Sequence, residues 1–198
     1  MSESRPATPP FERLDWPVRT ERLLIRPIVS ADFPALFAIR SQPEVALWLS
    51  GTATSYDAFA DEWAGSGRLD TTLAVERDGV VVGDVFLRVV DAWGQREVID
   101  DARGTQAEIG WLIDPTYAGE GLATEAAGAV LGMCFEGLGL RRVTAAAFAE
   151  NAASVRVMEK LGMRFEGRGV REALHRDRGW IDGVNAALLA DEWRAKRR

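Results

Sequence analysis

The sequence is poor in the two residues from which many enzymes build a catalytic centre. Its 198 residues include one cysteine, Cys134, and one histidine, His175. A single cysteine excludes an intramolecular disulfide framework and a multi-cysteine zinc site. A single histidine disfavours a histidine-based metal site and a Ser-His-Asp triad. We therefore expect no metal centre, a core position for Cys134 on the apolar side of a helix, and a surface position for His175 in a charged, loop-like stretch.

Long apolar runs and a basic surplus are also missing. No stretch approaches the run of about 18 apolar residues that indicates a transmembrane helix, and the N-terminal segment lacks the apolar region of a secretory signal. The chain has 30 acidic residues against 24 lysines and arginines, a formal net charge of −6. Nucleic-acid binders usually carry a basic surplus because they neutralise phosphates. We therefore expect a cytoplasmic protein that binds no membrane and no nucleic acid and that favours cationic partners.

Length and composition point to one globular domain. The chain is 47% apolar and 27% charged, which is ordinary for globular proteins, and a chain of this size buries about 70% of its unfolded surface. Residues 1–17 contain four prolines (Pro6, Pro9, Pro10 and Pro17) and predict a flexible N-terminal tail. We expect a single domain over residues 18–194 and a basic C-terminal tail over residues 195–198.

Hydrophobic spacing predicts a meander of strands followed by strand–helix alternation. Asp78-Gly79 gives a strong hairpin signal, and residues 91–105 are polar and acidic, as expected of a long loop. In chain order, the predicted elements are strand 22–28, helices 30–40 and 55–63, strands 71–77, 80–90 and 107–113, helix 121–138, strand 141–149, helix 151–161, and strands 163–172 and 180–189. This order predicts an α/β (α+β) fold with a mixed, mostly antiparallel central sheet of about seven strands flanked by helices.

A turn with two glycines connects the strand at 107–113 to the helix that follows it. In Gly119-Glu120-Gly121 the glycines remove side chains at a helix N-terminus, where converging N–H groups and the helix dipole suit a phosphate or pyrophosphate. Taken alone, this pattern is more often a tight turn without a ligand. No Gly-Lys-Ser/Thr follows, so the turn is not a Walker A loop, and the third glycine of a dinucleotide fingerprint is missing.

A second informative segment begins at Asn151, which is a good N-cap for the helix over residues 151–161. Ser154 follows one turn later, and taken alone it is more often a first-turn residue that bonds its own backbone than a catalytic group. The rest of the segment has the buried spacing of an ordinary amphipathic helix, ended by Gly162.

Together, several segments in register resemble one known family. The chain resembles the GNAT superfamily of N-acetyltransferases, and within it the RimJ/RimL-type branch that acetylates protein N-termini. The resemblance rests on Glu108-Ile109-Gly110-Trp111, on Gly119-x-Gly-x-Ala-Thr-Glu-Ala, and on Asn151-x-x-Ser-x-x-x-x-Glu-Lys-Leu-Gly-Met. Residues 20–26 resemble the opening strand of that branch, and residues 178–182 and 190–193 resemble its closing segment, so about residues 18–194 are covered.

The resemblance implies acetyl-CoA as co-substrate, bound where a GNAT-like sheet is splayed at its fourth and fifth strands. The gap would lie between residues 109–113 and 141–149. Pantetheine would pair with the strand backbone at Trp111, Leu112 and Ile113 in the manner of an added strand. Asn151 would hold the pantetheine arm, with Ser154 near the sulfur. The pyrophosphate would lie on the N–H groups of Tyr117, Ala118, Gly119, Glu120, Gly121, Leu122, Ala123 and Thr124.

The same resemblance implies direct transfer of the acetyl group to an amine, which must be neutral to attack. An N-terminal α-amine has a pKa of about 7.7–8.0 and a lysine amine one of about 10.4, so the α-amine needs less help from a base. Glu108 is the candidate base, with an exposed strand carboxylate in an ion pair as the alternative. Ser154 is the candidate acid, because neither tyrosine of the chain follows the Asn151 helix, where many relatives place one.

The acceptor stays open at this point. A protein or peptide N-terminal amine is the leading expectation; an aminoglycoside or polyamine, or a non-catalytic CoA-binding regulator, are the alternatives, and relatives occur as monomers and homodimers. Trp48 and Trp63 flank the region where this family builds its acceptor pocket, although core positions suit them equally well. The acidic residues of the 91–105 loop, Glu97, Asp100 and Asp101, could attract a cationic acceptor or simply be solvated.

Overall fold

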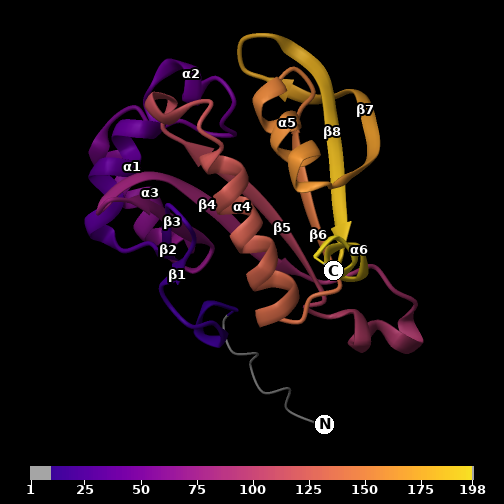
Figure 1. Ribbon diagram of the computed structural model, residues 1–198. Coiled ribbons are helices and arrows are strands. Elements are labelled where there is room, and N and C mark those ends of the chain that lie inside the picture. The colour runs from indigo at the N-terminus through magenta and orange to yellow at the C-terminus, as the bar shows by residue number, and fades with distance from the viewer. Residues whose placement is uncertain (1–9, 198) are drawn as a thin grey trace.

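The computed structural model describes residues 10–197, and its centre is one sheet of eight strands with helices on both faces (Figure 1). The strand order is β1-β2-β3-β4-β5-β6-β8-β7, and every neighbouring pair is antiparallel except β5 and β6. The strands are β1 Val18–Arg19, β2 Leu24–Pro27, β3 Thr72–Arg77, β4 Val80–Val90, β5 Gln106–Ile113, β6 Arg142–Phe148, β7 Arg164–His175 and β8 Gly179–Leu189. The helices are α1 Phe33–Arg40, α2 Pro43–Ala46, α3 Tyr56–Gly65, α4 Leu122–Gly132, α5 Ala152–Leu161 and α6 Ala190–Lys196.

This architecture confirms the mixed, mostly antiparallel α/β sheet predicted from the sequence. It has one strand more than the seven expected, because the two-residue β1 pairs with β2. Short helix α2 was also missed. The sequence pattern predicts no helix between those at 30–40 and 55–63, whereas Pro43 starts one there: proline at a first helical position loses no intrahelical hydrogen bond and favours a new start.

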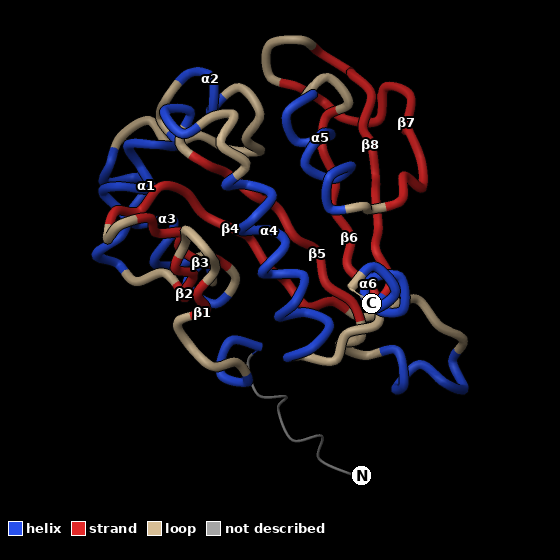
Figure 2. The backbone as a smooth tube through the Cα atoms, viewed as in Figure 1, coloured by secondary structure: helices blue, strands red, loops and turns tan. Residues whose placement is uncertain are grey.

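The sheet splits between β5 and β6. These two strands pair only at Gln106 with Arg142, Ala107 with Val143 and Glu108 with Thr144. Beyond this ladder, β5 stays paired with β4 and β6 stays paired with β8, so each arm keeps its own hydrogen bonds while the two separate. Figure 2 shows the resulting gap between the arm of β1–β5 and the arm of β6–β8. The predicted splay of the central sheet is therefore present.

Two apolar clusters cover the two faces of the β1–β5 arm. On one face, α4 buries Leu122, Ala126 and Val130 against the strands in the main core. On the other face, α1 and α3 pack aromatic rings over the strand residue Ala74. Because α1 to α3 cover the earlier strands, residues of β4 and β5 near the split remain accessible on that face.

The terminal segments predicted as tails, residues 1–17 and 195–198, are ordered where the structure describes them. Residues 1–9 and 198 lie outside the described residues. Phe11 is buried, and Trp16 packs edge-on against it with ring centroids 5.7 Å apart and donates from Nε1 to the Phe11 carbonyl at 2.7 Å. The predicted C-terminal tail is helical as far as Lys196, in α6. Burial of Phe11, with Trp16 partly buried against it, explains why residues 10–17 pack against the domain despite their prolines.

Two further elements depart from their predicted form. The loop at 91–105 contains 3-10 turns at Arg96–Ala102. The helix predicted to reach residue 138 is α-helical only to Gly132 and continues as a π-helical turn, Met133–Gly137. The predicted hairpin at Asp78-Gly79 is confirmed, with both residues at positive φ.

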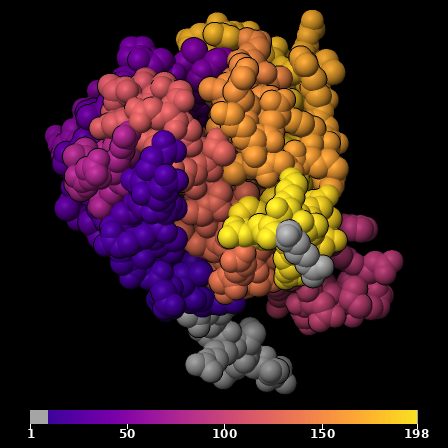
Figure 3. Space-filling model, in the orientation of Figure 1, coloured from indigo at the N-terminus to yellow at the C-terminus, as the bar shows by residue number. Residues whose placement is uncertain are grey.

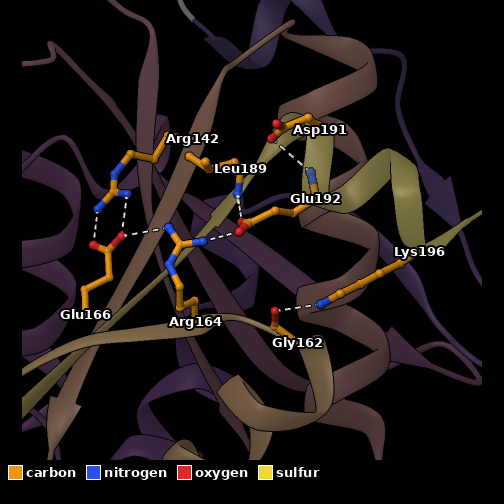
Figure 4. Close-up of polar contacts among 8 residues, drawn as sticks. All are labelled: Arg142, Gly162, Arg164, Glu166, Leu189, Asp191, Glu192 and Lys196. Atoms are coloured by element: carbon orange, nitrogen blue, oxygen red, sulfur yellow. Dashed lines mark hydrogen bonds and ion pairs between the residues drawn. The ribbon is translucent and has the colours of Figure 1, made fainter.

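Charged side chains tie the C-terminal elements together (Figure 4). Glu166 on β7 pairs with Arg142 on β6, a strand that is not its neighbour, so the ion pair reaches across β8. Arg164 contacts both Glu166 and Glu192 of α6. Lys196 donates to the carbonyl of Gly162 at 2.6 Å. These contacts fix the second arm as a unit beside the gap.

Candidate active site

A cavity of about 1200 Å³ occupies the gap between the two arms. Strands β4 to β8, the N-terminal turn of α4 and one side of α5 all contribute to it. In Figure 3, the first part of the chain (indigo to purple) and the last third (orange to yellow) lie on opposite sides of the coral surface that includes α4. The predicted site residues that line the cavity are Glu108, Trp111, Leu112, Ile113, Tyr117, Ala118, Gly119, Gly121, Leu122, Ala123, Thr124, Asn151 and Ser154.

Glu120 is the predicted site residue that does not line the cavity. Its carboxylate forms an ion pair with Arg77, and its carbonyl accepts a hydrogen bond from Nη1 of Arg22 at 2.9 Å. The side chain of Glu120 therefore points away from the cavity. Its backbone N–H remains part of the predicted pyrophosphate site. Sequence spacing places a residue in a turn but does not say which way its side chain points.

Six consecutive backbone N–H groups, those of residues 119–124, form a cradle at the start of α4. Within residues 10–197 none of them donates a hydrogen bond to a protein group, whereas the N–H of Glu125 already bonds the carbonyl of Gly121 at 3.0 Å. Gly119 and Gly121 have φ of +83° and +82°, a left-handed conformation that side chains disfavour. The positive end of the helix dipole adds to these donors, so the cradle suits a phosphate or pyrophosphate.

The cradle is braced from behind by the turn that joins β1 to β2. Glu125 accepts hydrogen bonds from Oγ1 of Thr20 at 2.6 Å, from the backbone N–H of Arg22 at 2.9 Å and from its Nε at 2.7 Å. Burial raises the pKa of the Glu125 carboxyl, but the hydrogen bonds from Thr20 and Arg22 outweigh it, and the net pKa lies below the usual range. Glu125 is therefore held ionised and neutralised by Arg22 instead of repelling an anion in the cradle.

The edge of β5 forms a second wall of the cavity. Beyond Glu108 this edge has no strand partner among the described residues, although the opposite edge stays paired with β4 up to Ile113. Trp111, Leu112 and Ile113 all line the cavity there. Strand backbone without a partner can pair with an extended ligand that has amide groups.

Asn151 and Ser154 lie on the opposite arm at the start of α5. Oδ1 of Asn151 accepts a hydrogen bond from the N–H of Ser154 at 3.1 Å, which confirms the predicted N-cap. Among residues 10–197, the Ser154 hydroxyl makes no hydrogen bond of its own, and the residue lines the cavity. Only its backbone bonds the cap, so its hydroxyl can reach a ligand.

Glu108 lies at the point where the two arms part. Its carboxylate forms an ion pair with Nη2 of Arg88, its cross-strand partner on β4, at 2.6 Å, and its side chain is 40% exposed. The alternative predicted for Glu108, an exposed strand carboxylate in an ion pair, is therefore present in the structure. The residue also lines the cavity. Its role as a base stays a prediction.

A second carboxylate in the cavity, that of Glu172, was missed by the sequence analysis. It lies in a β-bulge where the pairing of β7 with β8 shifts between Gly169 and Ala173. Asp182 fixes the bulge by accepting hydrogen bonds from the N–H of Arg171 at 2.9 Å and from Nε of Arg168 at 2.7 Å. The bulge turns Glu172 out of the strand alternation and toward the cavity.

Two glycines leave the space that the Glu172 carboxylate occupies. A Cβ at Gly169 on β7, or at Gly183 on β8, would overlap that carboxylate. Gly183 itself lines the cavity. Glycine inside a strand signals a bulge or a close approach, and these two glycines were the available sequence signal for the feature.

The remaining predicted residues lie in the cavity wall, on the surface or in the core. Trp48 lines the cavity, whereas Trp63 is buried in the cluster of α1 and α3. Residues 91–105, including Glu97, Asp100 and Asp101, do not line it, so the acidic loop is solvated surface rather than part of the acceptor site. Cys134 is confirmed as a core residue, and burial raises the pKa of its thiol to about 12.

The prediction for His175 was wrong. It is only 2% exposed, at the end of β7, and its ring packs against those of Trp48 and Phe148. Burial of this residue depends on aromatic partners far away in sequence, which a local charged pattern does not reveal.

Over residues 10–197, no group of three or more His, Cys, Asp or Glu side chains is placed to hold a metal ion. In the same part of the chain, no helix has the length and apolar character needed to span a membrane.

A split mixed sheet, with an unpaired strand edge and a helix N-terminus whose N–H groups lack protein acceptors at the split, is the architecture expected of an acyl-CoA-dependent transferase. The family model described as "Acetyltransferase (GNAT) domain" matches residues 22–164. The chain belongs to the GNAT acetyltransferase family, whose members use acetyl-CoA and act on an amine acceptor, and it is an acetyltransferase. The resemblance to the GNAT superfamily seen in the sequence is thereby confirmed.

Known proteins similar to this chain span nearly its whole length. An uncharacterized N-acetyltransferase of Bacillus subtilis, YnaD, is 30% identical over 179 residues, which are 89% of this chain and 98% of YnaD. A GNAT-family acetyltransferase structure from Bacillus anthracis is 29% identical with a TM-score of 0.74, covering 88% of this chain and 99% of that one. Mycobacterium smegmatis RimJ in complex with CoA-disulfide is 25% identical with a TM-score of 0.69, covering 86% of this chain and 83% of that one.

Proposed function

We propose that this enzyme transfers an acetyl group directly from acetyl-CoA to a primary amine, in the RimJ/RimL manner, and that the acceptor is the N-terminal α-amine of a protein or peptide. The observation that carries the proposal is the continuity of one cavity from the N–H cradle of residues 119–124 to a group of carboxylates on α2, α3 and β7. The likeness to RimJ supports this branch.

The residues present fit coenzyme A as the donor. The cradle has six N–H donors without protein acceptors, which suits the pyrophosphate. The free edge at Trp111, Leu112 and Ile113 would pair with the amide groups of pantetheine, and the side-chain amide of Asn151 would bind the same arm. Arg156 and Lys160 lie one turn apart on α5, line the cavity and have no ion-pair partner within residues 10–197. We assign them to a phosphate of the same ligand.

The acceptor half of the cavity is acidic. Arg40 is neutralised by Asp84, with Nη2 of the arginine 2.9 Å from Oδ1 of the aspartate. Three carboxylates also line the cavity, and among the described residues they have neither a hydrogen-bond partner nor an ion-pair partner: Glu44, Glu62 and Glu172. Unpaired carboxylates attract a protonated amine from solution, so they support a cationic acceptor.

The chain's own groups would then handle the protons. When bound, acetyl-CoA supplies the activated acetyl group. Glu108 or Glu172, directly or through water, would accept the proton that the amine must lose before it attacks. A strand N–H near Trp111 would stabilise the developing oxyanion, and the hydroxyl of Ser154 would donate a proton to the departing thiolate.

A pooled-acceptor assay tests the proposal. Purified protein and acetyl-CoA are incubated with peptides that have free N-termini, with the same peptides blocked at the N-terminus but carrying lysine, and with polyamines and aminoglycosides. Mass spectrometry should find a single added acetyl group on the free α-amines. Acetylation confined to lysine side chains or to small amines would contradict the peptide assignment.

A small cationic molecule is the second candidate acceptor. The three unpaired carboxylates favour it, because a polyamine or aminoglycoside carries several positive charges and could contact more than one of them. If no amine is acetylated although coenzyme A binds tightly, the chain is a CoA-binding regulator instead.

A further inference from the structure

The turn between β7 and β8 closes onto a segment from the opposite arm of the split sheet. This turn consists of residues 175–178, and the segment that it contacts, residues 47–52, follows α2 (Figure 1). The buried contact at its centre joins Nε2 of His175 to the carbonyl oxygen of Leu47, 2.8 Å apart. Residues 128 positions apart in sequence are therefore held together beside the cavity.

The hydrogen bonds define the state of the His175 ring. The backbone N–H of Asp177 donates to Nδ1 at 3.1 Å, and an N–H donor can only meet a ring nitrogen that has no hydrogen of its own. The hydrogen is therefore on Nε2, which donates to Leu47. Because both ring nitrogens are occupied by backbone groups, His175 is not available to accept or donate a proton in the reaction.

The ring also packs against two aromatic residues of the cavity wall. Its centroid is 5.8 Å from that of Trp48 on the first arm and 5.2 Å from that of Phe148 on the second, both in edge contacts. Trp48 and Phe148 line the cavity, and their own rings are 6.1 Å apart. The three rings thus form one cluster of mutual contacts, in which buried His175 helps to fix the relative position of two wall residues from different arms.

The two arginines of the turn reinforce this contact from outside. Arg176 donates to Oγ1 of Thr52 at 2.9 Å and to the carbonyl of Leu49. The guanidinium of Arg178 lies 5.0 Å from the centre of the Trp48 ring. Leu49 and Ser50 line the cavity as well. The position of the whole 47–52 segment therefore depends on the β7–β8 turn.

We propose that His175 is a positioning residue for the amine acceptor, acting through Trp48 and Leu49. The wall it fixes lies on the face of the sheet that carries α1 to α3, opposite the α4 cradle. Glu172, one of the unpaired carboxylates, precedes His175 on the same strand. Loss of the buried contact would release the acceptor wall while leaving the cradle and the β5 edge in place. This inference rests on the proposed transfer to an amine.

The experiment compares wild type with two variants. His175→Phe keeps a ring against Trp48 and Phe148 but loses both hydrogen bonds, and Arg176→Gln removes the neighbouring guanidinium contacts from the surface. At saturating acetyl-CoA, we expect His175→Phe to raise the acceptor KM at least fivefold and Arg176→Gln to raise it about twofold. The kcat values and the Kd for coenzyme A, measured by calorimetry, should stay within about twofold of wild type.

Hydrogen exchange separates a local effect from a general loss of folding. Amides of residues 47–52 should exchange at least tenfold faster in His175→Phe, while those of α4 and β5 keep wild-type protection. If His175→Phe does not fold, the acceptor KM and exchange rates of Arg176→Gln decide the question alone. An unchanged acceptor KM, or a fall in coenzyme A affinity that matches the rise in KM, would overturn the proposal.

Failure of the proposed function gives a different result. If wild type acetylates no amine, the transfer proposal fails, and the acceptor role of His175 fails with it, although residues 47–52 would still lose protection in the variant. If wild type is active and the variant loses protection with normal kinetics, only the role of His175 fails.

Discussion

Arg22 and Glu125 form a bracket behind the cradle: the carboxylate of Glu125, on the first turns of α4, accepts hydrogen bonds from both the backbone and the side chain of Arg22. The same guanidinium donates to the carbonyl of Glu120 inside the turn. The bracket orders the turn before any ligand binds and neutralises the Glu125 carboxylate next to the cradle. Binding to a preorganised site avoids the entropy cost of ordering the turn.

Removing the arginine should therefore weaken the binding of coenzyme A. In Arg22→Ala, the Glu125 carboxylate loses its cation and faces the pyrophosphate, so we expect the Kd to rise about tenfold, or ~1.4 kcal/mol. Adding Glu125→Gln removes the repulsion and should recover part of the loss. Calorimetry on wild type, both single variants and the double variant checks this. Equal affinities for Arg22→Ala and the double variant would show that Glu125 does not repel the ligand.

A negatively charged side chain placed in the cradle tests whether the cradle binds the pyrophosphate of coenzyme A. Gly121→Asp places a carboxylate against the expected pyrophosphate and strains the backbone, and binding of coenzyme A should become undetectable by calorimetry. Gly104→Asp is the matched control, because Gly104 also has positive φ, +60°, but lies outside the cavity. Wild-type affinity in Gly121→Asp, or equal losses in the two variants, would refute the assignment of the cradle.

The two carboxylates offered as bases can be separated by their pH profiles. If Glu108 accepts the proton, Glu108→Gln should lower kcat at neutral pH by ten- to a hundredfold and flatten the acidic limb of the profile. The affinity for coenzyme A should hardly change. Glu172→Gln, which removes the same charge from the same cavity, is the comparison. A normal profile for Glu108→Gln and a flattened one for Glu172→Gln would transfer the role to Glu172.

These two residues also show what the sequence alone could predict. Glu108 was found because strand alternation and a family motif are local patterns, and the cradle was found because glycines at a helix start have local chemical meaning. Glu172 was missed because its direction depends on a bulge set by pairing with β8. No local pattern records which residue of a neighbouring strand lies opposite.

His175 was missed for a related reason. Its partners are the carbonyl of Leu47 and the rings of Trp48 and Phe148, which the chain brings together only when the two arms form. The splay, by contrast, was implied by the family resemblance. Local conformation and element order were therefore predictable, whereas contacts between the two arms were not.

The basic pair on α5 gives a prediction about the donor. If Arg156 and Lys160 hold the 3′-phosphate of coenzyme A, wild type should bind coenzyme A at least fivefold more tightly than dephospho-coenzyme A. In Arg156→Gln/Lys160→Gln this preference should vanish, with the affinity for dephospho-coenzyme A unchanged. Arg194→Gln, on α6 and outside the cavity, removes a charge without touching the site. Should the double variant keep the preference, the phosphate is held elsewhere.

The ion pair across β8 predicts how the second arm responds to acid. The hydrogen bonds from Arg142, followed by those from Arg164, lower the pKa of Glu166 from 4.5 to about 2. Since the pKa of the folded form is depressed, the pair stabilises the fold fully above pH 4.5 and progressively less as the pH falls toward 2. Glu166→Gln should therefore lower the Tm at pH 7, and the difference from wild type should shrink between pH 4.5 and 2.

Thermal unfolding of both proteins across this pH range measures the effect. Glu97→Gln is the matched control, because Glu97 forms no ion pair within the described residues and lies outside the second arm. Its Tm should follow that of wild type at every pH. A Tm difference between Glu166→Gln and wild type that stays constant down to pH 2 would mean that Glu166 stabilises the fold through packing rather than charge. In that case the ion pair with Arg142 would not be what joins β6 to β7 across β8.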